Sequence, residues 1–388
     1  MNFFDNTEVA FSLKSDSELE RAYFLFKMIQ NQPMVRIGTA VTNFALKAKL
    51  PVEGLIRSTV FDHFCGGVNE EDCLPVIDKM YEKGKVCSVL DYSVEGKEGE
   101  AIFDETMEKI LKIIKFGSEK EAIPYAVFKP SGFGRFALYQ KITAKKELSA
   151  AEIVEWERVK ERFDKVCAVA LEKNVPLLID AEESWMQAAA DDLLETLMET
   201  YNKDKAIVFN TLQMYRHDRM DYLKGLHARA LQKGFHIGIK VVRGAYMEKE
   251  RQRAKEQNYP SPICVDKKAT DNNYDAAVHY MMKHKNMAIF AGTHNEESSM
   301  LVVALAKKYT IAPNDARLWF GQLFGMSDHI SFNLAKEGYN VAKYLPFGPV
   351  RDVMPYLIRR AEENTSVAGQ TSRELNLLKT ERNRRKLV

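Results

Sequence analysis

Two adjacent arginines, Arg359 and Arg360, are the residues whose type and spacing most directly suggest chemistry. In the stretch YLIRRAEEN, Tyr356, Arg359, Arg360 and Glu363 would share one face of a helix, because they lie zero, three, four and seven positions along it. Two guanidinium groups held in place by carboxylates form a fork suited to a carboxylate ligand. A solvent-exposed stripe of ion pairs, worth only about 0.3–0.5 kcal/mol each, is the simpler alternative. The tyrosine on the same face favours a ligand, which we infer to be a small carboxylic acid.

Further polar side chains gather where apolar, β-rich runs end. In chain order they are Asp91, Lys129, Asp180, Glu182, Glu183, Gln213, Lys240, Arg243, Thr293, His294, Asn295, Gln322 and Tyr344. Singly, each has an ordinary alternative: His294 could be a hydrogen-bonded structural histidine, and the lysines could be partners in buried ion pairs. Together they are too polar for a packed interior and indicate a ligand site.

Eight β-rich runs carry these residues, and each is followed by an amphipathic helical stretch. The runs cover residues 86–92, 125–130, 175–183, 206–213, 237–246, 287–295, 318–326 and 339–348. Strands that alternate with helices require a parallel sheet with right-handed crossovers. Eight such units over about 280 residues predict an α/β fold, a closed (βα)8 TIM-type barrel with its chemistry at the carboxyl ends of the strands. An open doubly wound sheet is the weaker alternative.

The pattern changes at both ends of the barrel. Residues 1–80 show helical pieces and no convincing strand, which predicts a helical arm, and residues 81–370 form the barrel domain. The tail at 371–388 ends in RELNLLKTERNRRKLV, which has six Lys or Arg among its 16 residues and leucines at 375, 378 and 387. A basic amphipathic helix could lie on an anionic membrane surface. A solvated helix end is the simpler interpretation.

Composition narrows the class of protein. The 388 residues are 46% hydrophobic, which suits a large core, and 56 Lys and Arg against 54 Asp and Glu leave a formal charge of +2. That balance argues against a nucleic-acid partner, because such proteins neutralise phosphates. The five scattered cysteines form no CxxC pair and predict reduced thiols without a zinc site. No signal peptide and no apolar run near ~18 residues is visible, so we expect a cytoplasmic protein.

One motif suggests a different kind of site, a dinucleotide-binding turn. GFGRFA, residues 132–137, follows a strand and fits the GxGxxG/A pattern of dinucleotide-binding turns. It belongs to the second strand of a barrel pattern, and Arg135 and Phe136 stand inside the turn that would receive a pyrophosphate. We therefore do not expect a Rossmann-type site there.

The chain resembles the proline dehydrogenase family through six motifs that occur in the family's own order: LLIDAEE, KVVRGAY, GTHN, QLFGM, YLPFG and YLIRRAEENTS. The resemblance covers about residues 86–370, and this family's barrel occurs alone or as the first enzyme of bifunctional proline utilization proteins. It implies a distorted barrel whose last helix lies over the mouth and which holds FAD noncovalently. The implied reaction is oxidation of L-proline to Δ1-pyrroline-5-carboxylate, with hydride transfer from C5 to flavin N5.

The resemblance also implies substrate contacts. Arg359 and Arg360 would bind the substrate carboxylate with help from Lys129, and Asp180 would order the site. Glu95 would pair with the first arginine when the mouth closes. The helix pattern of YLIRRAEEN, and not the resemblance, suggests that Glu363 keeps an arginine of the fork in its rotamer. The substrate ring would be enclosed by Tyr344, Tyr356, Ala245, Tyr246 and Leu323.

For the flavin, the resemblance implies contacts from Asp180, Gln213, Lys240, Val242, Gly244, Ala245, Thr293, His294 and Asn295. Lys240 stands where some members have arginine, and either cation near N5 favours reduced flavin. Met247 stands where the bifunctional enzymes have an aromatic residue, which leaves the contacts to the adenine end open.

Substrate choice and partners follow from the same resemblance. Tyr344 should crowd a 4-hydroxyl group, so proline is preferred over 4-hydroxyproline. Electrons would pass to a membrane quinone, and a separate pyrroline-5-carboxylate dehydrogenase would take the product. The expected location is cytoplasmic, with peripheral attachment to the inner face of the cytoplasmic membrane through the basic tail as an option.

Two other functions compete. Lys129 or Lys240 could form a Schiff base, as in class I aldolases, in an enzyme that is colourless and trapped by borohydride with its substrate. A degenerate barrel kept as a membrane-associated scaffold would suit the basic tail, but the polar residues and both arginines are present.

Overall fold

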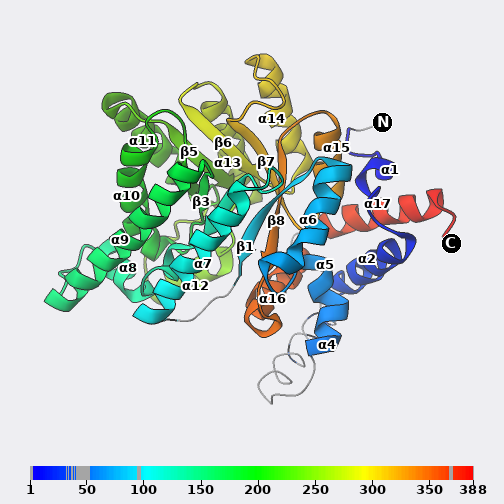
Figure 1. The fold of residues 1–388 in the computed structure, drawn as a ribbon, viewed down its shortest axis with the longest axis horizontal. Coiled ribbons are helices and arrows are strands. Elements are labelled where there is room, and N and C mark those ends of the chain that lie inside the picture. Colours follow the sequence, from blue (N-terminus) through cyan, green and yellow to red (C-terminus); the bar gives the residue numbers. More distant parts are fainter. Residues whose placement is uncertain are drawn as a thin grey trace. The chain divides into compact units, whose positions relative to one another are not determined.

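The structure, a computed structural model, describes residues 3–31, 33, 35, 38, 40, 53–93, 98–366 and 370–387. Eight strands form one closed parallel barrel in chain order, and helices alternate with them (Figure 1). The strands are β1 (Cys87–Tyr92), β2 (Tyr125–Phe128), β3 (Leu177–Ile179), β4 (Val208–Gln213), β5 (Ile237–Val242), β6 (Met287–Gly292), β7 (Leu318–Leu323) and β8 (Val341–Phe347). The predicted fold class is confirmed.

Most strands end earlier than the sequence pattern suggested. The run at 175–183 contributes only Leu177–Ile179 to β3, and the run at 237–246 ends as β5 at Val242. The predicted ends were too late because polar residues such as Asp180 and Arg243 follow the last ladder position instead of extending it. Several predicted site residues therefore lie directly after a strand, where a parallel barrel exposes its loops.

By contacts the chain forms two compact units, residues 1–95 with 322–388 and residues 96–321. The unit at 96–321 contains strands β2 to β6, most of β7, and the 3-10 helix η2 (Pro130–Gly132). Its α-helices are α7 (Glu100–Ser118), α8 (Phe136–Thr143), α9 (Ala150–Lys173), α10 (Ser184–Tyr201), α11 (Arg219–Lys233), α12 (Met247–Glu256), α13 (Lys267–Met282) and α14 (Glu296–Lys308).

Local sequence sets the ends of these helices. Helix α9 begins with a capping box, because the Ser149 hydroxyl accepts from the Glu152 amide while the Glu152 carboxylate accepts from the Ser149 amide. Asn174 caps the end of α9 and Gly234 caps the end of α11, both in the left-handed conformation that closes a helix. These caps place the following strand or loop at a defined point.

Aromatic rings fill the core of this unit. Tyr125 of β2 makes edge-to-face contacts with Phe209, Phe290 and Trp319, at centroid distances of 5.6, 5.4 and 5.3 Å. Gly321 of β7 leaves room for one of these rings, since a Cβ there would lie 2.1 Å from Cε1 of Phe290. The barrel is therefore a packed core on which the strand ends are rigidly held.

The unit at 1–95 and 322–388 contains β1, β8 and a set of helices. They are α1 (Thr7–Ala10), α2 (Asp16–Ile29), α4 (Glu53–Ile56), the π-helix η1 (Arg57–Phe61), α5 (Asp62–Phe64), α6 (Glu70–Gly84), α15 (Asp328–Lys336), α16 (Val350–Ser366) and α17 (Gln370–Arg384). Strands β1 and β8 pair in parallel, with Cys87 opposite Ala342 and Tyr92 opposite Phe347. Helix α16 packs against α2, α4, η1 and α17. The placement of this helix over the barrel mouth stays a prediction.

Helix α17, which contains most of the basic tail, packs against α1 and α2. Its leucines Leu375, Leu377 and Leu378 are buried in a cluster with residues of α1 and α2. Several cations of this helix and its C-terminal end are paired as well: Arg373 with Asp5 at 2.6 Å, Arg382 with Glu20 at 2.5 Å, and Arg385 with Asp16 at 3.0 Å. The apolar face that a membrane-bound helix would use is thus occupied within the protein.

Two further findings concern the described residues as a whole. None of their helices combines the length and the apolar character needed to cross a bilayer. The five cysteines are free and buried, and burial raises the pKa of the Cys65 thiol well above its usual range.

Candidate active site

The centre of the candidate site in the unit at 96–321 is an ion pair between Lys240 and Asp180. Lys240 lies in β5 with its side chain 7% exposed, and Asp180 follows β3 with its side chain 17% exposed. The pair brings together two predicted site residues from strands that are two apart in the barrel. A buried ammonium needs such a carboxylate, because an isolated charge there would be expensive.

Next to this pair, Gln213 and Glu182 form a buried polar network. The Gln213 amide at the end of β4 donates to the Glu182 carbonyl oxygen at 2.6 Å. The Glu182 carboxylate accepts from the amide and the hydroxyl of Ser131, at 2.9 and 2.7 Å. Burial raises the pKa of Glu182 to about 7, while the bonds from Ser131 and the charge of Lys129 act in the opposite direction. The half-buried Lys129 is thereby placed close to this carboxylate.

The predicted GAY motif forms an open turn after β5. Gly244 has φ +132°, and a Cβ there would lie 2.6 Å from the ring of Tyr215, so only glycine fits. Val242 and Tyr246 are half-buried, whereas Gly244 and Ala245 are exposed. The turn leaves a stretch of backbone within reach of a ligand.

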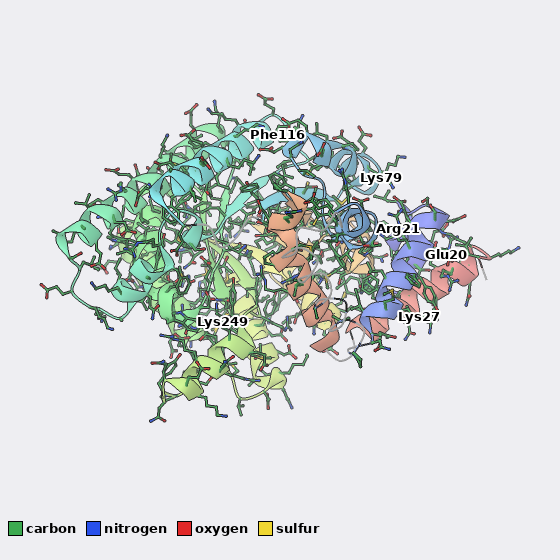
Figure 2. The ribbon with its side chains drawn as sticks, turned by 90° about the horizontal axis from the view of Figure 1, so that it is seen from below. Glu20, Arg21, Lys27, Lys79, Phe116 and Lys249 are labelled. Atoms are coloured by element: carbon green, nitrogen blue, oxygen red, sulfur yellow. The ribbon has the colours of Figure 1, made fainter. Side chains whose placement is uncertain are left out.

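Helix α12, which follows this turn, is tied to the segment after β3. The Glu250 carboxylate accepts from the amide and the hydroxyl of Ser184, both at 2.6 Å. Lys249, labelled in Figure 2, forms an ion pair with Glu183. These contacts hold the helix start, and with it the GAY turn, against the loop that carries Asp180.

The residues after β6 form a third group. Arg243 donates to the Thr293 hydroxyl at 2.9 Å and to the Ser298 hydroxyl at 3.0 Å, and pairs with Asp271 at 2.7 Å. The Asn295 side-chain oxygen caps α14 by accepting from the Ser298 amide at 2.8 Å. That oxygen is therefore already used within the protein. His294, which lies between Thr293 and Asn295 in the chain, is half-buried.

In the other unit, α16 carries the predicted arginine fork. Val353, Tyr356, Leu357 and Arg360 are buried, and their positions zero, three, four and seven along the helix define its inner face. The Arg360 guanidinium lies 5.1 Å from the centroid of the Tyr356 ring. Arg359 is only half-buried at the edge of that face, so the structure distinguishes the two arginines.

Other predicted residues of this unit lie on β7, β8 and β1. Leu323 packs against the apolar cluster that contains Tyr356, and Tyr344 of β8 is buried and accepts from the Phe324 amide through its carbonyl at 2.8 Å. Asp91 accepts from the Ser93 hydroxyl at 2.9 Å. Glu95 and the side chain of Glu363 lie outside the described residues, so their predicted roles stay predictions.

Sequence reasoning placed Glu182 and Arg243 at strand ends but gave neither a role, and it missed Ser131 and Glu250. The run DAEE signalled excess acid after one strand, but nothing local shows that two of its members are buried. In the GFGRFA turn, Arg135 is paired with Glu155 at 2.6 Å and directly precedes α8, and the absence of a Rossmann-type site there stays a prediction.

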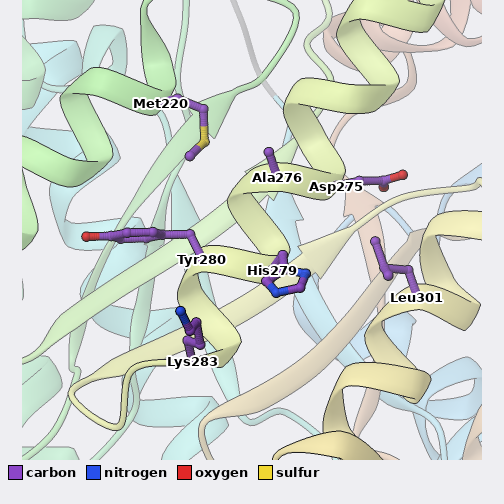
Figure 3. A pocket seen from close by; sticks show the side chains of 7 residues that line it. All are labelled: Met220, Asp275, Ala276, His279, Tyr280, Lys283 and Leu301. Carbon is purple, nitrogen blue, oxygen red and sulfur yellow. The ribbon is translucent and has the colours of Figure 1, made fainter.

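A pocket of about 470 Å³ lies on the helices outside the barrel strands (Figure 3). Its lining residues come from α11, from α13 with its C-cap Lys283, and from α14. They are Met220, Asp275, Ala276, His279, Tyr280, Lys283 and Leu301. None of them is a predicted site residue. Among the described residues, no group of three or more His, Cys, Asp or Glu side chains could hold a metal ion.

The sequence profile of the proline dehydrogenase family matches residues 73–373. The chain belongs to the proline dehydrogenase family. It is accordingly an oxidoreductase, and the resemblance found in the sequence motifs is confirmed.

Members of the proline dehydrogenase family and related proteins match over most of the chain. The carbapenem antibiotics biosynthesis protein CarD of Pectobacterium carotovorum is 36% identical over 352 residues, 90% of this chain and 91% of that protein. The mitochondrial proline dehydrogenase 1 of Arabidopsis thaliana is 30% identical over 97% of this chain and 85% of that protein.

A crystal structure of proline utilization A from Bdellovibrio bacteriovorus, inactivated by N-propargylglycine, shares the fold with a TM-score of 0.70 and 20% identity. The match covers 97% of this chain but only 38% of that larger protein. The two proteins therefore share the fold over the matched part. The rest of the larger protein lies outside the match.

Proposed function

We propose that this chain oxidises L-proline to Δ1-pyrroline-5-carboxylate with bound FAD as the hydride acceptor, and that a quinone takes the electrons. The family assignment supports proline oxidation. The observation that carries the finer proposal is the buried pair of Lys240 and Asp180 beside the open Gly244–Ala245 turn. A fixed cation next to accessible backbone suits a large polar cofactor.

The residues after β3, β4, β5 and β6 fit a flavin. Gly244 gives the exposed turn a backbone conformation, φ +132°, that other residues rarely adopt, and Lys240 supplies a buried positive charge whose position is fixed by Asp180. The side-chain amide of Gln213 is held at its NH2 group, which orients its oxygen as an acceptor. The residues proposed to hold FAD are Asp180, Gln213, Lys240, Val242, Gly244, Ala245, Thr293, His294 and Asn295. When bound, FAD supplies the acceptor for a hydride from proline C5.

For the substrate, we propose that Arg359 and Arg360 bind the carboxylate with the assistance of Lys129. The ring of Tyr356 supports the Arg360 guanidinium, which keeps this cation in one orientation before a ligand arrives. Tyr344, Tyr356, Leu323, Ala245 and Tyr246 are proposed to enclose the apolar ring and exclude water. Hydride removal from C5 requires a neutral amine and a fixed near-attack position.

The aldolase alternative is disfavoured by the contacts of Lys240. A Schiff base forms when the lysine nitrogen attacks a carbonyl carbon, so Lys240 would first have to leave its ion pair with Asp180. Retention of colour by the purified protein and resistance to borohydride inactivation would agree with this.

The destination of the product is a separate matter. The name of the Pectobacterium relative places that protein in antibiotic biosynthesis, whereas we propose a catabolic role here, with a separate pyrroline-5-carboxylate dehydrogenase as the next enzyme. A cytoplasmic location, with quinone reduction at the membrane surface, is part of this proposal. Growth of a deletion strain on proline as the only nitrogen source tests it.

The decisive experiment is the visible spectrum of the purified protein before and after anaerobic addition of L-proline. A flavin band that bleaches with proline supports cofactor, substrate and reductive half-reaction together. A colourless protein that FAD cannot reconstitute would overturn the cofactor, and a flavin band unchanged by proline would overturn the substrate.

A further inference from the structure

Glu182 is a buried carboxylate to which the proposed reaction assigns no task. Its two carboxylate oxygens accept from the amide and the hydroxyl of Ser131, at 2.9 and 2.7 Å. Its own amide donates to the Gln187 side chain at 2.8 Å, and its carbonyl accepts from Gln213 at 2.6 Å. Four hydrogen bonds therefore fix Glu182 relative to the ends of β2 and β4 and the first turn of α10.

The turn that Glu182 holds begins at Lys129. Lys129 directly follows β2, and its carbonyl accepts from the Gly132 amide at 2.9 Å to close the 3-10 helix η2. Its neighbour Pro130 accepts from the buried Tyr139 hydroxyl at 2.9 Å. Ser131, which Glu182 binds, is two residues from Lys129 in this short turn. Movement of Ser131 would therefore move the backbone from which the lysine side chain extends.

A buried carboxylate is a costly way to hold a turn, because an apolar side chain would fill the same space without desolvating a charge. The bidentate geometry offers something that packing cannot, namely a fixed orientation of the Ser131 peptide. Burial raises the pKa of this carboxyl group, and the positive charge of Lys129 acts in the opposite direction.

We propose that Glu182 is a positioning residue that holds the 129–132 turn so that the Lys129 ammonium is directed at the substrate carboxylate. The inference rests on the proposed function, since it gives Lys129 the role of a carboxylate ligand. Glu182 itself does not touch the substrate. Its contribution is to reduce the freedom of Lys129 before proline binds.

The test compares Glu182→Ala with Glu182→Gln in the full-length holoenzyme. Glutamine can accept from the Ser131 amide and donate to its hydroxyl, so it preserves both bonds without the charge. We expect Glu182→Ala to raise KM for proline about tenfold with a smaller change in kcat, and Glu182→Gln to stay within about threefold of the wild type. Equal loss in both variants would overturn the positioning role.

A double-mutant comparison with Lys129→Ala distinguishes a positioning role of Glu182 from a general loss of structure. In a Lys129→Ala background, Glu182→Ala should raise KM by less than about twofold, because the side chain that it positions is already gone. The matched control is Glu250→Ala, which removes the same kind of bidentate contact, to Ser184, from a different turn. Its effect should be additive with Lys129→Ala, and additive behaviour of Glu182→Ala would contradict the proposal.

A measurement without proline makes the outcome independent of the proposed reaction. Hydrogen exchange of the peptide that contains Ser131 should accelerate in Glu182→Ala and remain slow in Glu182→Gln. If proline does not reduce the wild-type flavin, the proposed function is wrong, and the exchange data still decide whether Glu182 holds the turn. Should Glu182→Ala fail to fold, Ser131→Ala removes one of the two bonds and should raise KM severalfold, while an unchanged KM would overturn the inference.

Discussion

The ammonium of Lys240 in β5 and the carboxylate of Asp180 after β3 form an ion pair in which both side chains are largely removed from solvent. Loss of Asp180 removes the carboxylate that pairs with this buried ammonium. We expect Asp180→Ala to lower the free energy of unfolding by about 3–5 kcal/mol, measured by urea denaturation. The exposed pair of Lys233 and Glu199 is the control, since Glu199→Ala should cost less than about 1 kcal/mol. Equal losses in the two variants would mean that the buried pair contributes no more than a surface one.

The arginines of α16 should be sensitive to a change that keeps their charge. Arg360→Lys removes the planar group that lies over Tyr356, so KM for proline should rise about tenfold or more, and Arg359→Lys should behave similarly through loss of bidentate binding. Arg351→Lys on the same helix is the matched control, because Arg351 is exposed and pairs with Glu53. Steady-state kinetics with proline measures all three. An Arg360→Lys enzyme with the KM of the control would remove this residue from substrate binding.

Glu182 should make the stability of the protein depend on pH. Burial raises its pKa from 4.5 to about 7, so between these values the folded state retains a proton that the unfolded chain has lost. The free energy of unfolding should therefore fall as the pH rises from 4.5 to 7, by roughly 3 kcal/mol from this group. Glu182→Gln cannot titrate, so the stability difference between wild type and variant isolates the effect. A difference that stays constant over this range would show that the pKa is not raised.

Helix α17 should act as part of the core. Leu378 is fully buried, so Leu378→Ala should lower the free energy of unfolding by about 2–5 kcal/mol, whereas the exposed Asn376→Ala should change it by less than about 0.5 kcal/mol. Urea denaturation measures both. Deletion of residues 373–388 should destabilise the protein, because these residues include most of α17. A deletion variant that is fully stable and has lost vesicle binding would contradict this and support a membrane role of the tail.

Tyr344 tests the choice between proline and 4-hydroxyproline. Its buried ring on β8 should crowd a hydroxyl group on the substrate ring, so Tyr344→Ser should raise kcat/KM for trans-4-hydroxy-L-proline relative to proline by about tenfold. Parallel kinetics with the two substrates gives the ratio. No gain on hydroxyproline would indicate that another residue sets the preference.

Much of the fold could be predicted because its signals are local. Alternation of β-rich runs and amphipathic stretches depends on side-chain period, and all eight strands were found in their predicted places. The ends of the strands could not be predicted to the residue. Ladder pairing stops where the neighbouring strand no longer offers a partner, and that depends on residues far away in the chain.

The basic tail shows where local pattern is insufficient. Cations and leucines at helical spacing are equally compatible with a membrane surface, a solvated helix end and a buried helix. Only the packing of α17 against α1 and α2 shows that Leu375, Leu377 and Leu378 are covered and that the arginines meet Asp5, Asp16 and Glu20.

The sequence by itself determined the barrel, the family and the set of polar residues near the strand ends, because periodicity and motif order are properties of the chain alone. The tertiary structure alone decided how those residues are paired. It joined Lys240 to Asp180, tied Glu182 to Ser131 across 51 positions, and buried Arg360 more deeply than Arg359. Such contacts arise when distant segments are brought together, and burial then makes each buried charge depend on a particular partner.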